Sequence, residues 1–145
     1  MSDIFEEYLS YHEPAFTTAC ESVLRDPFPE DAAYGIFWFQ VDDTIWDRLP
    51  IALAWGDFDH GSEVQYPSRL SSLRAPEWSP PDGLGDTVIG DFFFRWIARC
   101  WTKAGGAESA IPFYCYNYHT AAIFCLRRGR YVTEDDIDAD IRPTN

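Results

Sequence analysis

Apolar residues recur along this chain in two rhythms, and each rhythm predicts a different kind of element. Between residues 5 and 24 they recur every three or four positions, which is typical of one face of a helix. Pro14 interrupts this segment, and a proline inside a helix deletes a hydrogen bond and clashes with the preceding turn. We therefore expect a helix that Ser2 caps, that kinks or restarts at Pro14, and that ends in the stretch 26–29.

A central helix is predicted from an apolar face with an i, i+1, i+4, i+5 rhythm. The face consists of Val88, Ile89, Phe92, Phe93, Trp96, Ile97, Cys100 and Trp101. Asp86 or Thr87 is expected to cap its start, because short polar side chains accept hydrogen bonds from free backbone N–H groups. The pair Gly105-Gly106 is expected to end it, because glycine readily adopts the left-handed conformation that follows a helix.

Strands are predicted on either side of this helix. Residues 34–41 are apolar on both alternating faces, which indicates a central strand covered on both sides. Further strands are expected at 51–55, 111–118 and 121–126, with a tight turn at Arg128-Gly129 leading into Tyr131-Val132. The order of elements favours two similar halves that share one sheet. The expected fold class is α+β, with a mixed or antiparallel sheet of four to five strands and both helices packed on it.

The chain of 145 residues has the length of one domain, so residues 1–145 are expected to form a single globular unit. Residues 57–86 lose all periodicity and are rich in Pro, Ser and Gly, which predicts a long irregular surface excursion. Residues 134–145 form an acidic tail. Thr133 and Asp136 have the spacing of a capping box, so a short acidic helix is expected to begin there.

Aromatic residues make up 17% of the chain, so much of the core must be built from rings. The four cysteines, at positions 20, 100, 115 and 125, are widely spaced among apolar residues. This pattern predicts buried, reduced thiols without a disulfide or a metal. The acidic N-terminus does not resemble a signal peptide, and no apolar run approaches the ~20 residues that cross a bilayer. A cytoplasmic location is expected.

Charge is divided unevenly along the chain. Residues 1–63 carry 14 acidic residues against two arginines, for a net charge of −12, and residues 134–145 carry a net charge of −4. Residues 64–133 are slightly basic, at +3, and the whole chain carries −13. Such a field repels nucleic acid and anionic membranes, and it attracts a basic partner. The simpler interpretation is that the charge keeps an aromatic-rich protein soluble.

Candidate catalytic groups are few. Asp57, Asp59 and His60 could together hold a divalent metal or position a water, although a polar turn after a buried strand explains the same residues. Cys115 and His119 are four residues apart, but on a strand that spacing spans roughly 13 Å, so one metal would not reach both. We expect no catalytic residue, no metal and no cofactor.

The chain resembles the small acidic immunity proteins that bacteria encode beside polymorphic, contact-dependent or type VI secreted toxins. The resemblance rests on the aromatic strand 34–41 with Asp42-Asp43 after it, on the segment Pro76-Glu77-Trp78, and on the acidic ends of the chain. It implies a cytosolic protein that binds one cognate toxin domain and blocks it. It carries over no residue's role by position.

These observations predict an immunity protein that occludes a basic toxin surface with an acidic face. Carboxylates would meet the toxin, and nearby rings, Trp55 among them, would anchor it. The predicted contact residues are Asp42, Asp43, Trp46, Asp47, Asp57, Phe58, Asp59 and Glu63. Two alternatives remain open: a small metal-dependent hydrolase that uses Asp57, Asp59 and His60, and an adaptor or orphan interaction domain.

Overall fold

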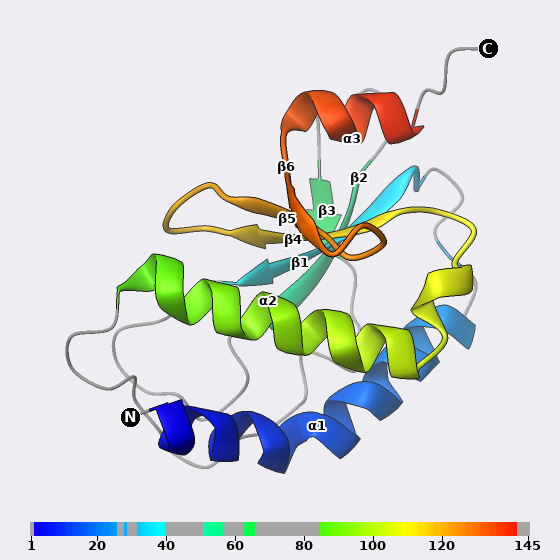
Figure 1. Cartoon of the computed structure of the whole chain (residues 1–145). Helices are drawn as coiled ribbons and strands as arrows, with labels where there is room; N and C mark the ends of the chain where they lie inside the picture. The colour runs from blue at the N-terminus through cyan, green and yellow to red at the C-terminus, as the bar shows by residue number, and fades with distance from the viewer. Residues whose placement is uncertain are drawn as a thin grey trace.

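The computed structural model describes residues 2–25, 28, 32–39, 51–56, 63–65 and 85–141 (Figure 1). Its elements are α1 (Ser2–Arg25), β1 (Tyr34–Phe39), β2 (Ile51–Gly56), β3 (Glu63–Gln65), α2 (Asp86–Lys103), the short 3-10 helix η2 (Gly106–Glu108), β4 (Phe113–Asn117), β5 (Ile123–Cys125), β6 (Arg130–Val132) and α3 (Glu134–Ile141). Within these residues no helix is both long enough and apolar enough to span a membrane.

The strands form one mixed sheet in the order β3-β2-β1-β4-β5-β6. The central strands β1 and β4 are parallel, and every other pair is antiparallel. Each half of the chain supplies a helix followed by three strands, as the order of predicted elements indicated. The α+β prediction is confirmed, but the sheet has six strands rather than four or five. The additional strand, β3, lies in the segment predicted to be irregular, because three residues are too few to show an alternating pattern.

The sheet is covered on both faces, which gives the molecule three layers (Figure 1). Alternate residues of a strand point to opposite faces. Phe37 and Leu53 therefore pack toward α1 and α2, whereas Ile36 and Ala54 pack in a second cluster with Ile137 and Ile141 of α3. The prediction that the first strand is buried on both sides is confirmed. Burial on both faces explains why its sequence shows no alternation of apolar and polar residues.

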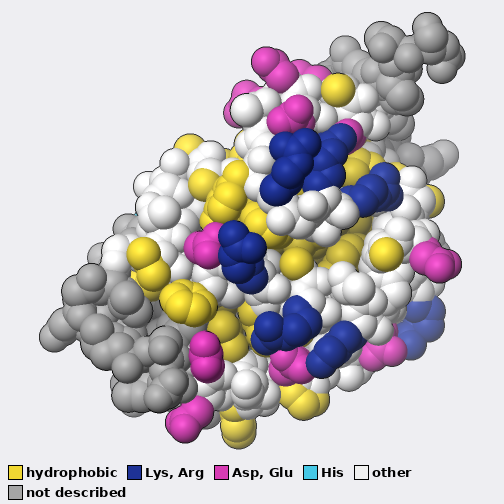
Figure 2. Space-filling view, viewed as in Figure 1, with side chains coloured by type: hydrophobic (Ala, Val, Ile, Leu, Met, Phe, Trp, Pro, Cys, Tyr) yellow, Lys and Arg dark blue, Asp and Glu magenta, His cyan; other side chains and the backbone are white. Residues whose placement is uncertain are grey.

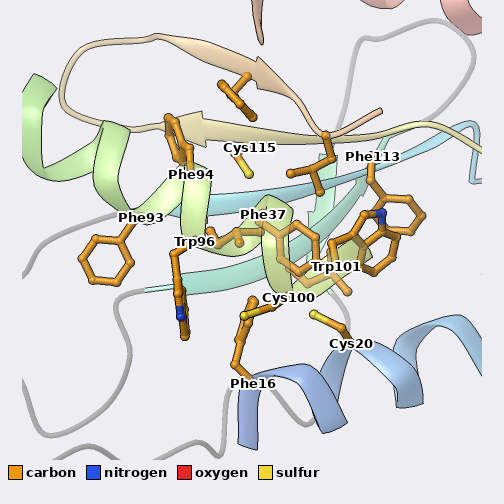
Figure 3. Close-up of a cluster of buried hydrophobic side chains, with 14 of the residues drawn as sticks. Phe16, Cys20, Phe37, Phe93, Phe94, Trp96, Cys100, Trp101, Phe113 and Cys115 are labelled. Atoms are coloured by element: carbon orange, nitrogen blue, oxygen red, sulfur yellow. The ribbon is translucent and has the colours of Figure 1, made fainter. Parts of the chain in front are cut away.

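Rings dominate the core between the helices and the sheet (Figure 3). Phe16 of α1 stacks on Trp96 of α2 with ring centroids 4.7 Å apart. At the edge of this contact Glu13 pairs with Lys103 at 2.7 Å and with Arg99 at 3.4 Å. The hydrogen bond from Lys103 is the main cause that lowers the pKa of Glu13. These groups are partly exposed, so the ion pairs orient the helices while ring burial stabilises them.

Three details of the predicted helices differ from the structure. Helix α2 has Gly85 at its N-cap, without a side-chain cap, so neither Asp86 nor Thr87 has the predicted role. Val88 is 43% exposed, whereas Phe94, absent from the predicted face, is fully buried. The reason is that α2 packs against both the sheet, through Phe94 and Phe124, and α1, through Trp96 and Phe16, so its apolar face is wider than one stripe. Gly105 follows the helix with a left-handed φ of 99°, as expected.

Helix α1 runs without a break through Pro14 and curves along its length (Figure 1). Pro14 is exposed, so its missing N–H falls on the solvent side, where water can satisfy the freed carbonyl. The expected restart at Pro14 is therefore wrong. The side chain of Ser2 and most of the stretch 26–29 lie outside the described residues.

All four cysteines are buried and carry free thiols, as predicted. Burial raises the pKa of Cys100 to about 11 and raises that of Cys20 further. The thiols of Cys20 and Cys100 therefore remain protonated at neutral pH, and all four cysteines serve as small apolar core residues.

Candidate protein-binding surface

A row of side chains crosses the sheet at the carboxyl end of its two central strands. The register pairs Trp38 with Tyr116, Tyr116 with Ile123, and Ile123 with Val132. All four residues belong to the face that α3 covers. Helix α3 has only eight residues, about 12 Å at 1.5 Å per residue, so it cannot cover that whole face.

Three aromatic side chains gather where this row crosses β1 and β4. The ring centroids of Trp38 and Tyr116 are 4.8 Å apart, and those of Trp38 and Tyr118 are 6.1 Å apart. Trp38 and Tyr116 are half-buried, and Tyr118 is 54% exposed. We call Trp38, Tyr116 and Tyr118 the aromatic surface. Exposed aromatic groups of this kind are enriched at protein interfaces, because they give contact area at small entropic cost.

The turn after β4 holds Tyr118 in place. Asn117, 1% exposed, exchanges backbone hydrogen bonds with residues 121 and 122, and its side-chain oxygen accepts the His119 N–H at 2.9 Å. Ala121 adopts a left-handed φ of 62°, which closes the turn. Because the turn is tied at several points, Tyr118 is presented in an arrangement that exists before any partner arrives.

Helix α3 brings negative charge to the same end of the sheet. The predicted capping box is present: the Thr133 N–H donates to Asp136 at 2.9 Å, and the Asp136 N–H donates to the Thr133 hydroxyl at 3.3 Å. The backbone hydrogen bond from Thr133 lowers the pKa of Asp136. Glu134 and Asp135 are exposed in the first turn, directly after Val132 of the row.

The last turn of α3 is tied to the sheet and to the β5–β6 turn. The buried Tyr114 hydroxyl donates to Asp140 at 2.5 Å, and Arg128 donates to both oxygens of that carboxylate, at 2.9 Å on one of them. Burial, followed by the hydrogen bond to Asp140, raises the pKa of Tyr114, so the phenol stays a donor. This arrangement fixes where the acidic helix lies relative to the aromatic surface.

Charge is separated on the described part of the molecule. In Figure 2 Lys and Arg side chains gather over α2 and the β5–β6 hairpin, and Asp and Glu side chains gather on α3. Several of the bases are matched locally, as Arg95 is by Asp91 at 2.9 Å. Burial alone would raise the pKa of Asp91, but hydrogen bonds from Tyr131 and Arg95 outweigh it and lower that pKa. On α3, Asp140 is paired with Arg128, and Glu134 and Asp135 are exposed in the first turn.

Most of the predicted contact residues lie outside the described residues: Asp42, Asp43, Trp46, Asp47, Asp57, Phe58 and Asp59. Glu63 begins β3, but its side chain is not among those described. In the described part of the sheet, Phe39 pairs with Ile51 at one end, and Tyr34 pairs with Gly56 at the other, roughly 17 Å away. Trp38 of the aromatic surface lies next to the first of these pairs.

Other sequence candidates divide between the core and the surface. Trp55 is 8% exposed and packs in the core, so it is unavailable as an anchor. Cys115 is fully buried, whereas His119 is exposed in the turn after β4. Among the described residues no three His, Cys, Asp or Glu side chains are placed to hold a metal ion. The hydrolase alternative stays a prediction, since Asp57, Asp59 and His60 lie outside those residues.

The sequence reasoning did not identify the aromatic surface. Trp38 looked like a core residue of a buried strand, and Tyr116 and Tyr118 looked like part of another. In the structure Trp38 and Tyr116 are only half-buried, and Tyr118 lies exposed in the turn after β4. Comparison of the chain with protein-family models, with curated proteins and with solved structures finds no significant match.

Proposed function

We propose that this protein is an immunity-type inhibitor that binds one basic toxin domain and blocks it by covering its active surface. The observation that carries the proposal is the concentration of negative charge in residues 1–63 and 134–145, which together hold 19 of the 24 acidic residues. Charge far in excess of what solubility needs suits a basic partner. If the toxin acts on nucleic acid, the carboxylates would occupy the groove that binds phosphates.

Charge and aromatic contacts would have separate effects on binding. Exposed carboxylates speed the encounter with a basic partner, and their effect weakens with salt because charges are screened beyond about 8 Å at physiological ionic strength. Buried aromatic anchors slow dissociation. The proposal includes action in the cytoplasm, a reducing compartment in which four free, buried thiols are stable.

The test is co-expression with the product of the neighbouring gene, followed by pull-down at low and high salt. We expect a complex whose association slows steeply as salt rises. The variant Asp42→Asn/Asp43→Asn/Asp47→Asn should associate more slowly and protect a toxin-expressing cell less well. The variant Glu6→Gln/Glu7→Gln/Glu21→Gln changes the net charge equally at exposed positions of α1, on the other side of the sheet. It should bind faster than the Asn variant.

Absence of a complex at both salt concentrations would refute the proposal. If both triple variants slow association equally, the association rate depends only on the net charge of the protein. In that case the acidic segment after β1 makes no specific contact.

A further inference from the structure

Exposed carboxylates lie at the same end of the sheet as the aromatic surface. Glu134 and Asp135 begin α3 directly after Val132, at the other end of the same row across the sheet. Aromatic rings with exposed carboxylates at the same end of the sheet suit a cation, because ring faces and acids both attract positive charge.

We propose that the aromatic surface is the main contact for the partner, and that it receives an Arg or Lys side chain from a basic protein segment. This inference rests on the proposed function and names the part of the protein that performs it. A cation lies favourably within about 6 Å of a ring centroid, above the ring face, and Trp and Tyr are the strongest acceptors. Tyr118 is exposed enough to offer its face, and Trp38 stands 6.1 Å from it.

The charge of the chain argues against other occupants. A second copy would bring another −13 to the same surface, and nucleic acid would bring phosphates beside Glu134 and Asp135. A basic protein segment is attracted by this negative charge both during its approach and in the complex. Because the turn after β4 is already ordered, the surface loses little conformational entropy when a partner binds.

The first experiment titrates the ¹⁵N-labelled protein with hexa-arginine at low salt, with hexa-glutamate as the opposite-charge control. The indole N–H signal of Trp38 is assigned with Trp38→Phe. We expect hexa-arginine, but not hexa-glutamate, to shift the signals of Trp38 and Tyr118. Tyr118→Ala should weaken this binding about tenfold.

Matched variants separate the site from general attraction to an acidic protein. Tyr11→Ala removes a tyrosine that is 69% exposed on α1, far from the aromatic surface, and should bind hexa-arginine like the wild type. Glu134→Gln/Asp135→Asn should weaken binding more than Glu6→Gln/Glu7→Gln, which removes the same charge from α1. Shifts that centre on α1, or Tyr118→Ala binding like Tyr11→Ala, would overturn the inference.

A second experiment repeats the pull-down of the neighbouring gene product with Tyr118→Ala and Tyr11→Ala. A partner lost only from Tyr118→Ala supports the inference. A partner retained equally by both variants refutes it and leaves the proposed function standing. If the wild type binds no partner, the proposed function fails, and the peptide titration alone decides the inference. A dimer of this chain that Tyr118→Ala dissociates would also overturn it.

Discussion

The ring of Phe113 lies against the α-carbon of Gly35 on the neighbouring parallel strand and fills the space that a side chain there would need. Phe113 cannot easily withdraw, since its ring centroid lies 4.4 Å from that of Trp101 and 5.5 Å from that of Trp55. Gly35→Ala should therefore lower the free energy of unfolding by about 1–3 kcal/mol, as overpacking does.

Denaturant unfolding measures this effect, and Gly85 provides a matched control. No heavy atom lies within 4 Å of a Cβ placed at Gly85, which is the N-cap of α2 in extended conformation. Gly85→Ser should keep or raise the stability by up to about 1 kcal/mol, because serine can cap the helix. An unchanged midpoint for Gly35→Ala would contradict the register between β1 and β4.

Trp96 should be the most sensitive position of α2. It is 1% exposed and stacks on Phe16, so Trp96→Ala should cost about 3–5 kcal/mol. Its indole N–H is buried without an acceptor among the described residues, so Trp96→Phe removes an unpaired donor and should cost less than half as much. Val88→Ala, at an exposed position of the same helix, should change stability by under about 0.5 kcal/mol. Equal losses for Trp96→Ala and Trp96→Phe would show that the N–H is paired.

Asp140 should hold α3 on the sheet. Asp140→Asn weakens the charge-assisted bonds from Tyr114 and Arg128 and should cost about 2 kcal/mol. Tyr114→Phe should cost about half as much, and the double variant should cost less than the sum, because the two residues share one bond. Thermal unfolding of the four proteins measures this coupling. Glu21→Gln, at an exposed position of α1, controls for loss of one charge, and strict additivity would refute the coupling.

His12 should make stability depend on pH. It is 3% exposed, and burial lowers its pKa below the ordinary value of 6.5. A group with a lowered folded-state pKa binds its proton more readily in the unfolded chain, so stability falls as pH drops below about 6.5. Unfolding measured from pH 7.5 to pH 5.5 should show this loss, and His12→Gln should flatten the slope. His119→Gln, in an exposed turn, should keep it, and an unchanged slope in His12→Gln would contradict the prediction.

The sequence determined the elements whose periodicity is long. The helix over Asp86–Lys103, the capping box at Thr133 and the burial of residues 34–37 follow from local patterns. Helix faces, caps and burial on two sides each leave a recognisable pattern over several residues. No local pattern predicted that α1 continues through Pro14 or that Glu63–Gln65 forms a strand.

Only the tertiary structure decided which aromatic residues reach the surface. In the sequence Trp38, Trp55 and Tyr116 are equivalent, since each lies in an apolar strand. Packing separates them, because Trp55 is buried in the core with residues of α1 and α2, whereas Trp38 and Tyr116 lie on the α3 side of the sheet and stay half-buried. The sequence by itself determined the net charge and its division along the chain. The folded sheet decided that the start of α3 lies at the same end of the sheet as Trp38 and Tyr116, because strand register joins residues that lie far apart in the chain.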